Sequence, residues 1–297
     1  MLFWDAPMQQ VHFRGLRFFL KRDDLLHPVM GGNKARKLHY FLRRDFPHVR
    51  KLLSYGSMQS NAMCALSEVA KHRGWAFHYY TRINPKLLSQ PEGNLKRALD
   101  NGMVLHALQE LPLSEKNLYS MCHIENDTLI IPEGVRCPEA QEGIALLARE
   151  IATWAKAHAQ ESLPVVLPSG TGTSALYLQK YLRLYAPAMQ VWTVPCVGDV
   201  AYLQQQFSVL EADATSHPKI LTPPKRYRFG KLYGELFAVW CEIKEETGVE
   251  FDLLYDPIAF VTLLDMPFAE QFIYIHQGGL LGNVTMIARY KAKFGRI

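Results

Sequence analysis

KLLSYGSMQSNAMCALSEVAKHRGWAFHYY, residues 51–80, is the stretch that decides the fold class. Its first apolar run, 51–56, ends in a glycine and predicts a short buried strand. Apolar residues then recur with helical spacing over 59–72, and a second apolar run at 75–80 predicts another strand. A strand, a helix and a strand in this order indicate a parallel sheet covered by helices.

The same alternation continues along the chain. Apolar spacing predicts further strands at 103–108, 127–134, 163–170 and 191–198, and further helices at 93–102, 139–158 and 173–185. The segment 216–230 is rich in proline and basic residues and follows neither period, so it is either a long loop near a site or a surface excursion. The sequence therefore predicts an α/β fold.

Composition restricts the class of protein. The 297 residues are 48% hydrophobic and 21% charged, which is ordinary for a soluble globular protein with one large unit or two domains. The net charge of +5 is spread along the chain, and the basic clusters are too short for a nucleic-acid surface. No apolar run approaches the roughly 20 residues that cross a bilayer, and the N-terminus lacks a signal-peptide pattern. We expect a soluble protein without a nucleic-acid or membrane partner.

The cysteines indicate a reducing compartment. They are odd in number, widely scattered and form no C-x-x-C pair: Cys64, Cys122, Cys137, Cys196 and Cys241. This pattern indicates neither a zinc site nor a disulfide framework. Free thiols fit the cytoplasm, and we predict that location.

Two glycines precede a lysine at Gly31-Gly32-Asn33-Lys34. Glycines let the backbone turn tightly and approach a ligand. Lys34 opens a helical run over 34–44, where the positive end of the helix dipole favours the neutral, nucleophilic amine. The alternative is a glycine turn before a helix with a solvated basic face.

Polar residues follow the predicted strand at 51–56. Ser57, Gln59, Ser60 and Asn61 lie where the first amides of a helix lack partners. Simple N-capping by Ser57 or Ser60 would also explain them.

A third feature is PSGTGTSAL, residues 168–176, between a predicted strand and a predicted helix. Small hydroxyl residues interleaved with glycines expose successive amides, which form a phosphate cradle together with the helix dipole. The spacing matches neither an ATP-type P-loop nor the dinucleotide fingerprint, so a monophosphate fits best. A capped turn without a ligand is the alternative.

The last feature is YIHQGGLLG, residues 274–282, a predicted strand that runs into a di-glycine turn. Alone it could be only a tight connection. Together with the reactive lysine, the phosphate loop and the polar strand end, it suggests pyridoxal phosphate (PLP) as the cofactor.

Two blocks resemble a known enzyme family. Residues 21–42, KRDDLLHPVMGGNKARKLHYFL, resemble the K-R-[ED]-D-L…GGNK-x-RKL-[EH]-[YF]-L segment of the 1-aminocyclopropane-1-carboxylate (ACC) deaminase and D-cysteine desulfhydrase family. Residues 54–74 are similar to its G-[GS]-x-QSN stretch, and PEG (132–134), the glycine–threonine loop and a late I-H-x-G-G follow in the family's order. These are fold-type II PLP enzymes similar to tryptophan synthase β. The resemblance covers most of the chain.

The resemblance implies an architecture. It predicts two open, twisted, mostly parallel sheets with flanking helices and a PLP cleft between a large and a small domain. Residues 1–36 and 137–297 would form the large domain and 37–136 the small domain. A homodimer is also implied.

The resemblance further implies a role for each matching residue. Lys34 would hold the cofactor as a Schiff base and move the Cα proton, and Asn61 would bind the cofactor's phenolic oxygen. Gln59, Ser60 and Asn61 would form the substrate site, with Ser60 also able to assist proton transfer. The phosphate would be held by Ser169, Gly170, Thr171, Gly172 and Thr173.

Three departures from the family pattern affect the chemistry. The family's D-P-V-Y-[TE]-G-K-A aligns with 256–261, so its tyrosine becomes Ala259 and its acidic or hydroxyl neighbour becomes Phe260. The threonine before the late glycine pair is Gln277, whose neutral amide could reach the pyridine nitrogen. A family tyrosine aligns with Phe229 or Tyr233, and only Tyr233 would keep a catalytic hydroxyl.

We therefore predict PLP-dependent α,β-elimination and deamination of a small amino acid. Losing the pair at 259 and 260 argues against ACC, so D-cysteine, converted to pyruvate, sulfide and ammonia, is the predicted substrate. The alternatives are a divergent ACC deaminase-like enzyme for another small amino acid and a catalytically silent PLP-binding protein.

Overall fold

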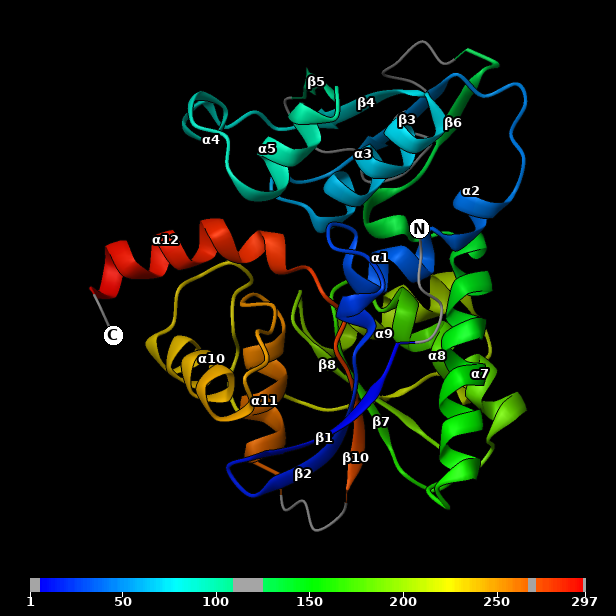
Figure 1. Cartoon of the computed structure of the whole chain (residues 1–297), viewed down its shortest axis with the longest axis vertical. Helices are drawn as coiled ribbons and strands as arrows, with labels where there is room; N and C mark the ends of the chain where they lie inside the picture. The colour runs from blue at the N-terminus through cyan, green and yellow to red at the C-terminus, as the bar shows by residue number, and fades with distance from the viewer. Residues whose placement is uncertain (1–5, 109–124, 267–270, 296–297) are drawn as a thin grey trace.

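The chain folds around two sheets (Figure 1), and the computed structural model describes residues 6–108, 125–266 and 271–295. The six-stranded sheet has the order β1 (Met8–Phe13), β2 (Leu16–Lys21), β10 (Phe272–Ile275), β7 (Val165–Ser169), β8 (Val191–Pro195) and β9 (Lys219–Ile220). The four-stranded sheet has the order β5 (Val104–Ala107), β4 (Ala76–Thr81), β3 (Lys51–Tyr55) and β6 (Thr128–Ile130). The predicted α/β fold with mostly parallel sheets is confirmed.

The helices follow most of the predicted pattern. They are α1 (Gly31–Lys37), α2 (His39–Arg43), α3 (Asn61–Arg73), α4 (Pro85–Ser89), α5 (Gly93–Asp100), α7 (Gln141–Ala157), α8 (Thr173–Tyr185), α9 (Val200–Leu210), α10 (Gly234–Thr247), α11 (Asp256–Leu264) and α12 (Asn283–Phe294). Short 3-10 helices lie at Asp23–Leu25, Glu133–Val135, Pro138–Ala140, Ala214–Ser216 and Leu280–Gly282. None of the helices in the described ranges is long and apolar enough to cross a membrane.

The smaller sheet forms as the opening stretch predicts. Leu52 on β3 pairs with Phe77 on β4, and both side chains are buried in the core that also contains residues of α3. Ser60 caps α3 by accepting hydrogen bonds from the amides of Ala62 and Met63, and Gly74 ends the helix at φ 70°. All four strands of this sheet lie between residues 51 and 130. The domain boundaries at 36/37 and 136/137 stay predictions.

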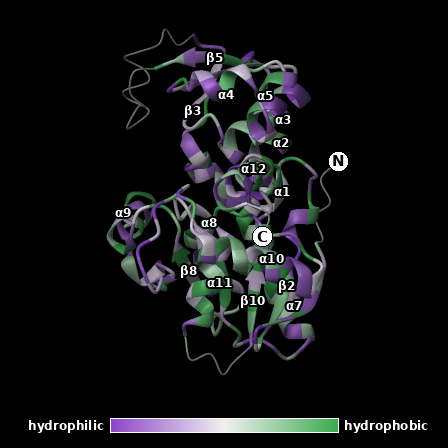
Figure 2. Ribbon diagram, turned by 90° about the vertical axis from the view of Figure 1, so that its left-hand side faces the viewer, coloured by the Kyte–Doolittle hydropathy of each residue, from purple (hydrophilic) through white to green (hydrophobic). Residues whose placement is uncertain are grey.

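The larger sheet separates two apolar clusters. Alternate residues of its central strands point to opposite faces: Leu167 and Ile273 pack with α7 and α8, whereas Phe272 and Tyr274 pack with α10 and α11. Figure 2 shows hydrophobic residues concentrated around β8, β10 and α11. The antiparallel pair β1–β2 at the edge turns at Arg14 and Gly15, which both have positive φ as a two-residue hairpin turn requires.

Helix α1 lies at the centre of the molecule and begins three residues before the predicted start at Lys34. Gly31 has φ +63°, and a Cβ there would lie 2.8 Å from the backbone nitrogen of Gly279, so the glycine lets α1 meet the turn after β10. On its other side, the missing Cβ of Gly143 would lie 1.9 Å from the carbonyl oxygen of Arg36. Only glycine at 143 allows α7 to pack this closely on α1.

The four cysteines within the described ranges, Cys64, Cys137, Cys196 and Cys241, are free thiols, and Cys122 lies outside these ranges.

Candidate active site

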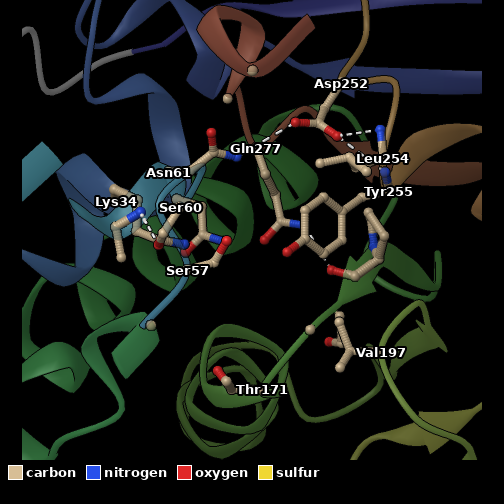
Figure 3. Close-up of a pocket in the computed structure, with 18 of the residues that line it drawn as sticks. Lys34, Ser57, Ser60, Asn61, Thr171, Val197, Asp252, Leu254, Tyr255 and Gln277 are labelled. Atoms are coloured by element: carbon tan, nitrogen blue, oxygen red, sulfur yellow. Dashed lines mark hydrogen bonds between the residues drawn. The ribbon is translucent and has the colours of Figure 1, made fainter. Parts of the chain in front are cut away.

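A cavity of about 470 Å³ is lined by residues from α1, from the ends of β3, β7, β8 and β10, and from the 252–256 segment. Ligands of parallel α/β proteins bind at such carboxyl ends of strands. All but one of the predicted site residues line it: Lys34, Gln59, Ser60, Asn61, Ser169, Gly170, Thr171, Gly172, Thr173 and Gln277. Figure 3 shows Lys34, Asn61, Tyr255 and Gln277 arranged around the cavity, with Thr171 at its lower edge.

Lys34 carries an amine suited to nucleophilic chemistry. Burial lowers the pKa of Lys34 to about 8, and the carboxylate of Asp252 opposes this shift only in part. A substantial fraction of the amine is therefore neutral near pH 8. From the sequence we expected the helix dipole to favour this state, whereas burial is its main cause in the structure.

Lys37 is a second buried lysine in the same cavity, one turn after Lys34. Its ammonium donates a hydrogen bond to the carbonyl oxygen of Gly134. A Cβ on Gly134 would lie 3.2 Å from Cγ2 of Thr171, so this hydrogen bond brings Lys37 beside the glycine–threonine loop. Burial, followed by the charge of Lys34, holds the pKa of Lys37 well below its usual value. An anion bound at the loop would stabilise the charge of Lys37.

The loop before α8 leaves a helix N-terminus open. Gly172 is the N-cap residue of α8, with φ 73°, and it has no side chain that could accept from the first amides of the helix. The missing Cβ of Gly172 would lie 2.5 Å from Phe207, so the loop packs on α9 with no room for a side chain. The α3 terminus, in contrast, is capped by Ser60. The α8 terminus is thus the better anion site of the two.

Asn61 is held in one orientation by its neighbours. Asn94 donates from Nδ2 to Oδ1 of Asn61 at 2.6 Å, and Nδ2 of Asn61 lies 3.5 Å from Oδ2 of Asp252. Asn61 therefore offers its remaining N–H group, not its carbonyl oxygen, to a ligand in the cavity. The hydroxyl oxygen of Ser60 accepts from the amides of Ala62 and Met63, and the hydroxyl also forms a hydrogen bond with the side chain of Tyr79.

Gln277 connects the end of β10 to its surroundings. Its Nε2 donates to the carbonyl oxygen of Pro168 at 2.7 Å, while its own backbone oxygen accepts from the amides of Gly32 and Asn33. These contacts fix the side chain against β7 and tie the last strand to α1.

Asp252, Tyr255 and Asp256 are among the residues of the cavity wall that sequence reasoning missed. Asp252 is buried, and its Oδ1 accepts from the amides of Leu254 at 2.7 Å and Tyr255 at 3.0 Å. Burial raises the pKa of Asp252 to about 6. The pKa of Tyr255 is also raised by burial, so its hydroxyl stays protonated, and it lies beside Gly170.

These residues correct the alignment at 256–261. Ala259 and Phe260 are completely buried in the core behind the larger sheet, away from the cavity. Pro257 lies in the first turn of α11, where proline is favoured, so the Asp-Pro pair marks a helix start. The family spacing D-x-x-Y-[TE] instead fits Asp252, Tyr255 and Asp256, four residues earlier. That spacing was the signal that could have found them.

Tyr233 is the predicted site residue that does not line the cavity. It precedes α10, its ring packs edge-on against Tyr227, and its hydroxyl accepts from the amide of Arg228 at 3.0 Å. Phe229 lines the cavity instead and contacts the Tyr255 ring. The structure therefore gives no support to a catalytic hydroxyl at 233. The 216–230 segment does lie near the site, through Phe229 and Gly230.

Comparison with known proteins gives consistent relatives, although no family model matches the chain. A rice (Oryza sativa subsp. japonica) protein named "Putative D-cysteine desulfhydrase 2, mitochondrial" is 26% identical over 94% of this chain and 81% of its own length. A Pyrococcus horikoshii protein named "Putative 1-aminocyclopropane-1-carboxylate deaminase" is 23% identical over 94% of this chain and 91% of its own length.

Solved structures agree on the fold. One described as an ACC deaminase homologue superposes with a TM-score of 0.82 at 20% identity, over 98% of this chain and 94% of that one. The resemblance to the ACC deaminase and D-cysteine desulfhydrase family is confirmed. A structure described as a threonine deaminase superposes with a TM-score of 0.67 at 15% identity, over 92% of both chains.

Proposed function

We propose that the chain is a PLP-dependent enzyme that releases ammonia from a small amino acid by α,β-elimination. The observation that carries this proposal is one cavity that joins a buried lysine of lowered pKa to an uncapped helix N-terminus. The family resemblance supports both the cofactor and the class of enzyme.

The donor set fits the cofactor. Lys34 supplies the amine that attaches it, and the first amides of α8, together with Lys37, supply positive charge for its phosphate. The remaining N–H group of Asn61 suits the phenolic oxygen of the cofactor. Nε2 of Gln277 donates to the carbonyl oxygen of Pro168, so the side-chain carbonyl oxygen of Gln277 is left for the ring nitrogen. A neutral amide there stabilises ring protonation less than a carboxylate would.

When bound, the cofactor supplies the electron sink that stabilises charge at the substrate Cα. The protein's own groups then move protons and orient the substrate. Lys34, neutral in part near pH 8, takes the Cα proton. The protonated hydroxyl of Tyr255 is placed to give a proton to a leaving group, and Ser60 and Gln59 hold the substrate carboxylate at the start of α3.

D-cysteine remains our first substrate, with pyruvate, sulfide and ammonia as products. The case against ACC rested on Ala259 and Phe260 and no longer stands, because Tyr255 and Asp256 line the cavity. An ACC deaminase-like reaction is therefore the second candidate, favoured by that pair. The catalytically silent alternative loses its main support for the same reason.

Turnover assays separate these candidates. Purified protein loaded with PLP would be offered D-cysteine, L-cysteine, D-serine and ACC, with ammonia, sulfide and keto acid measured. We expect sulfide and pyruvate from D-cysteine. Activity on ACC alone would replace the first substrate by the second. Bound cofactor without turnover of a full panel of amino acids would contradict an enzymatic role.

A homodimer and a cytoplasmic location are also part of the proposal, on the family resemblance and the free thiols respectively. Light scattering of the purified protein tests the dimer, and a monomer at working concentration would contradict it.

A further inference from the structure

Helix α12 and its N-cap residue, Gly282, present one stripe of residues to the cavity. Gly282, Met286 and Arg289 line it at spacings of four and three, which place them on one helical face, and Thr285 lies beside them. The inner end of this stripe is close to the predicted substrate site, because a Cβ on Gly282 would lie 3.3 Å from Oδ1 of Asn61. Arg289 is seven residues further along, about 10 Å at 1.5 Å per residue.

Arg289 is placed at the outer part of the cavity with its charge available. Its Nη2 donates to the carbonyl oxygen of Gly230 at 2.8 Å, and its Nη1 lies 3.1 Å from the sulfur of Met286. The second contact shows that the side chain leans back toward the start of α12, as helical side chains do. Within the part of the chain that the structure describes, no carboxylate forms an ion pair with it.

Some other cations of the C-terminal part of the chain do have carboxylate partners: Lys225 is paired with Glu235, and Lys244 on α10 is paired with Glu250. Two carboxylates of the cavity wall are engaged elsewhere: Asp252 accepts from backbone amides, and Asp256 accepts from the hydroxyl of Tyr274 at 2.6 Å. Arg289 thus has the chemistry of a recognition group for an anion that enters with the ligand.

The position of Arg289 separates it from the site of the substrate's α-carboxylate. That carboxylate belongs at the start of α3, with Gln59 and Ser60, at the inner end of the stripe. A group met by Arg289 must therefore be several bonds from the α-carboxylate. Arg228 and Lys231 lie close in sequence to Gly230, the residue whose carbonyl oxygen Arg289 contacts, and positive charge there favours the approach of anions.

We propose that Arg289 recognises a second anionic group on the substrate, carried on its β-carbon. This inference rests on the proposed function and names its substrate class: small amino acids whose β-substituent is negatively charged, such as a phosphate or a sulfonate. D-cysteine would then be a smaller substrate that lacks the favoured contact.

The reaction of such a substrate balances without an oxidant or a reductant. The Cα–H bond breaks and its proton passes to Lys34. The Cα–Cβ double bond forms as the Cβ–X bond breaks, and X leaves with the electron pair. Water then hydrolyses the released aminoacrylate, after tautomerisation, to the keto acid and ammonia.

The test compares O-phosphoserine with serine, as both enantiomers, because each pair breaks a Cβ–O bond and differs in charge. Wild type, Arg289→Gln, Arg289→Lys and the control Lys291→Gln would be measured. Lys291→Gln removes the same charge from the exposed side of the same helix. We expect Arg289→Gln to lower the phosphoserine-to-serine ratio of kcat/KM by about 10- to 100-fold, mainly through KM. The lysine variant should keep part of the preference and the control all of it.

A binding measurement keeps the inference independent of turnover. O-phosphoserine should raise the melting temperature of wild type and of Lys291→Gln, but not of Arg289→Gln. An unchanged ratio in Arg289→Gln, an equal loss in Lys291→Gln, or no binding of O-phosphoserine to wild type would overturn the inference. Turnover of neutral amino acids would leave the proposed function intact in each of these cases. Binding of O-phosphoserine through Arg289 without turnover of any amino acid would instead contradict the proposed function alone.

Discussion

Helix α1 carries two buried basic side chains, Arg36 and Lys34, whose surroundings shift their pKa values in opposite directions. Arg36 faces away from the cavity, where Asp23 binds its Nε and Nη2 and Glu150 binds its Nη1 and Nη2. Burial acts to lower the pKa of Arg36, but these carboxylates outweigh it and raise the pKa. Lys34, two residues earlier, faces the cavity, and burial lowers its pKa to about 8 because Asp252 compensates only in part.

The difference separates a structural role from a chemical one. A buried guanidinium with two carboxylates is held in its charged state and fixes the position of α1. A buried amine with one carboxylate nearby, too little to offset the effect of burial, can lose its proton and react. The same seven-residue helix therefore anchors itself through one face and offers a nucleophile from the other. Substitutions that change the surroundings of Lys34 should mainly affect activity, and those that change the surroundings of Arg36 should mainly affect stability.

The largest expected effect is on activity. Lys34→Ala should lower turnover by roughly 10³-fold or more, because it removes both the attachment point and the group that moves the Cα proton. Its melting temperature without cofactor should stay near that of wild type. Steady-state assays with D-cysteine and thermal unfolding check both parts. Activity within about tenfold of wild type would refute the role of Lys34.

Arg36→Met, in contrast to Lys34→Ala, should mainly lower the stability of the protein. It leaves Asp23 buried without its cation, while Glu150 keeps its ion pair with Lys21, and this should cost about 3–5 kcal/mol of unfolding free energy. Urea denaturation of the apoprotein measures this cost. Arg43→Met, on the exposed surface of α2, is the control and should stay within about 0.5 kcal/mol of wild type. Equal stability of the two variants would mean that the buried network does not anchor α1.

Gly143→Ala tests how closely α7 holds α1. The added Cβ would lie 1.9 Å from the carbonyl oxygen of Arg36, so one helix must move, at about 1–3 kcal/mol. The control is Gly234→Ala in α10, where the nearest atom lies at 3.8 Å. A destabilised Gly143→Ala beside an unaffected Gly234→Ala is the expected result in the same denaturation assay. No loss at 143 would show that the two helices are packed less tightly.

Asp252→Asn should give the smallest change, in the pH dependence of Lys34. The carboxylate raises the pKa of Lys34, so its removal should lower that pKa further, by about one unit. Labelling of the apoprotein amine with an acylating reagent should be half-maximal near pH 8 in wild type and at lower pH in the variant. A midpoint that moves to higher pH would contradict the assigned sign.

Much of the fold could be predicted because strand and helix periods are local. The helix at Thr173–Tyr185 matches its predicted range, and the junction at Ser60 forms the cap that its residue type favours. The hairpin at Arg14–Gly15 was missed because its short strands were not considered as a pair.

Site residues that belong to a local sequence motif could be predicted. Features of the site that depend on burial could not. Lys34, Asn61 and the glycine–threonine loop follow from such motifs. The lowered pKa of Lys34, the orientation of Asn61 by Asn94 and the exclusion of Tyr233 depend on contacts between distant segments. The family's D-x-x-Y spacing could have identified Tyr255 in place of Ala259. The proline at 257, however, placed the alignment four residues too far along the chain.

The central claim is that Lys34, and not Lys37, holds the cofactor covalently, since both amines line one cavity. Borohydride reduction of the PLP-loaded wild-type protein, followed by peptide mass mapping, tests it most directly. We expect the mass of the reduced cofactor on the peptide position of Lys34, with Lys37 unmodified. Attachment at Lys37, or no attachment under conditions that give a coloured protein, would contradict the claim.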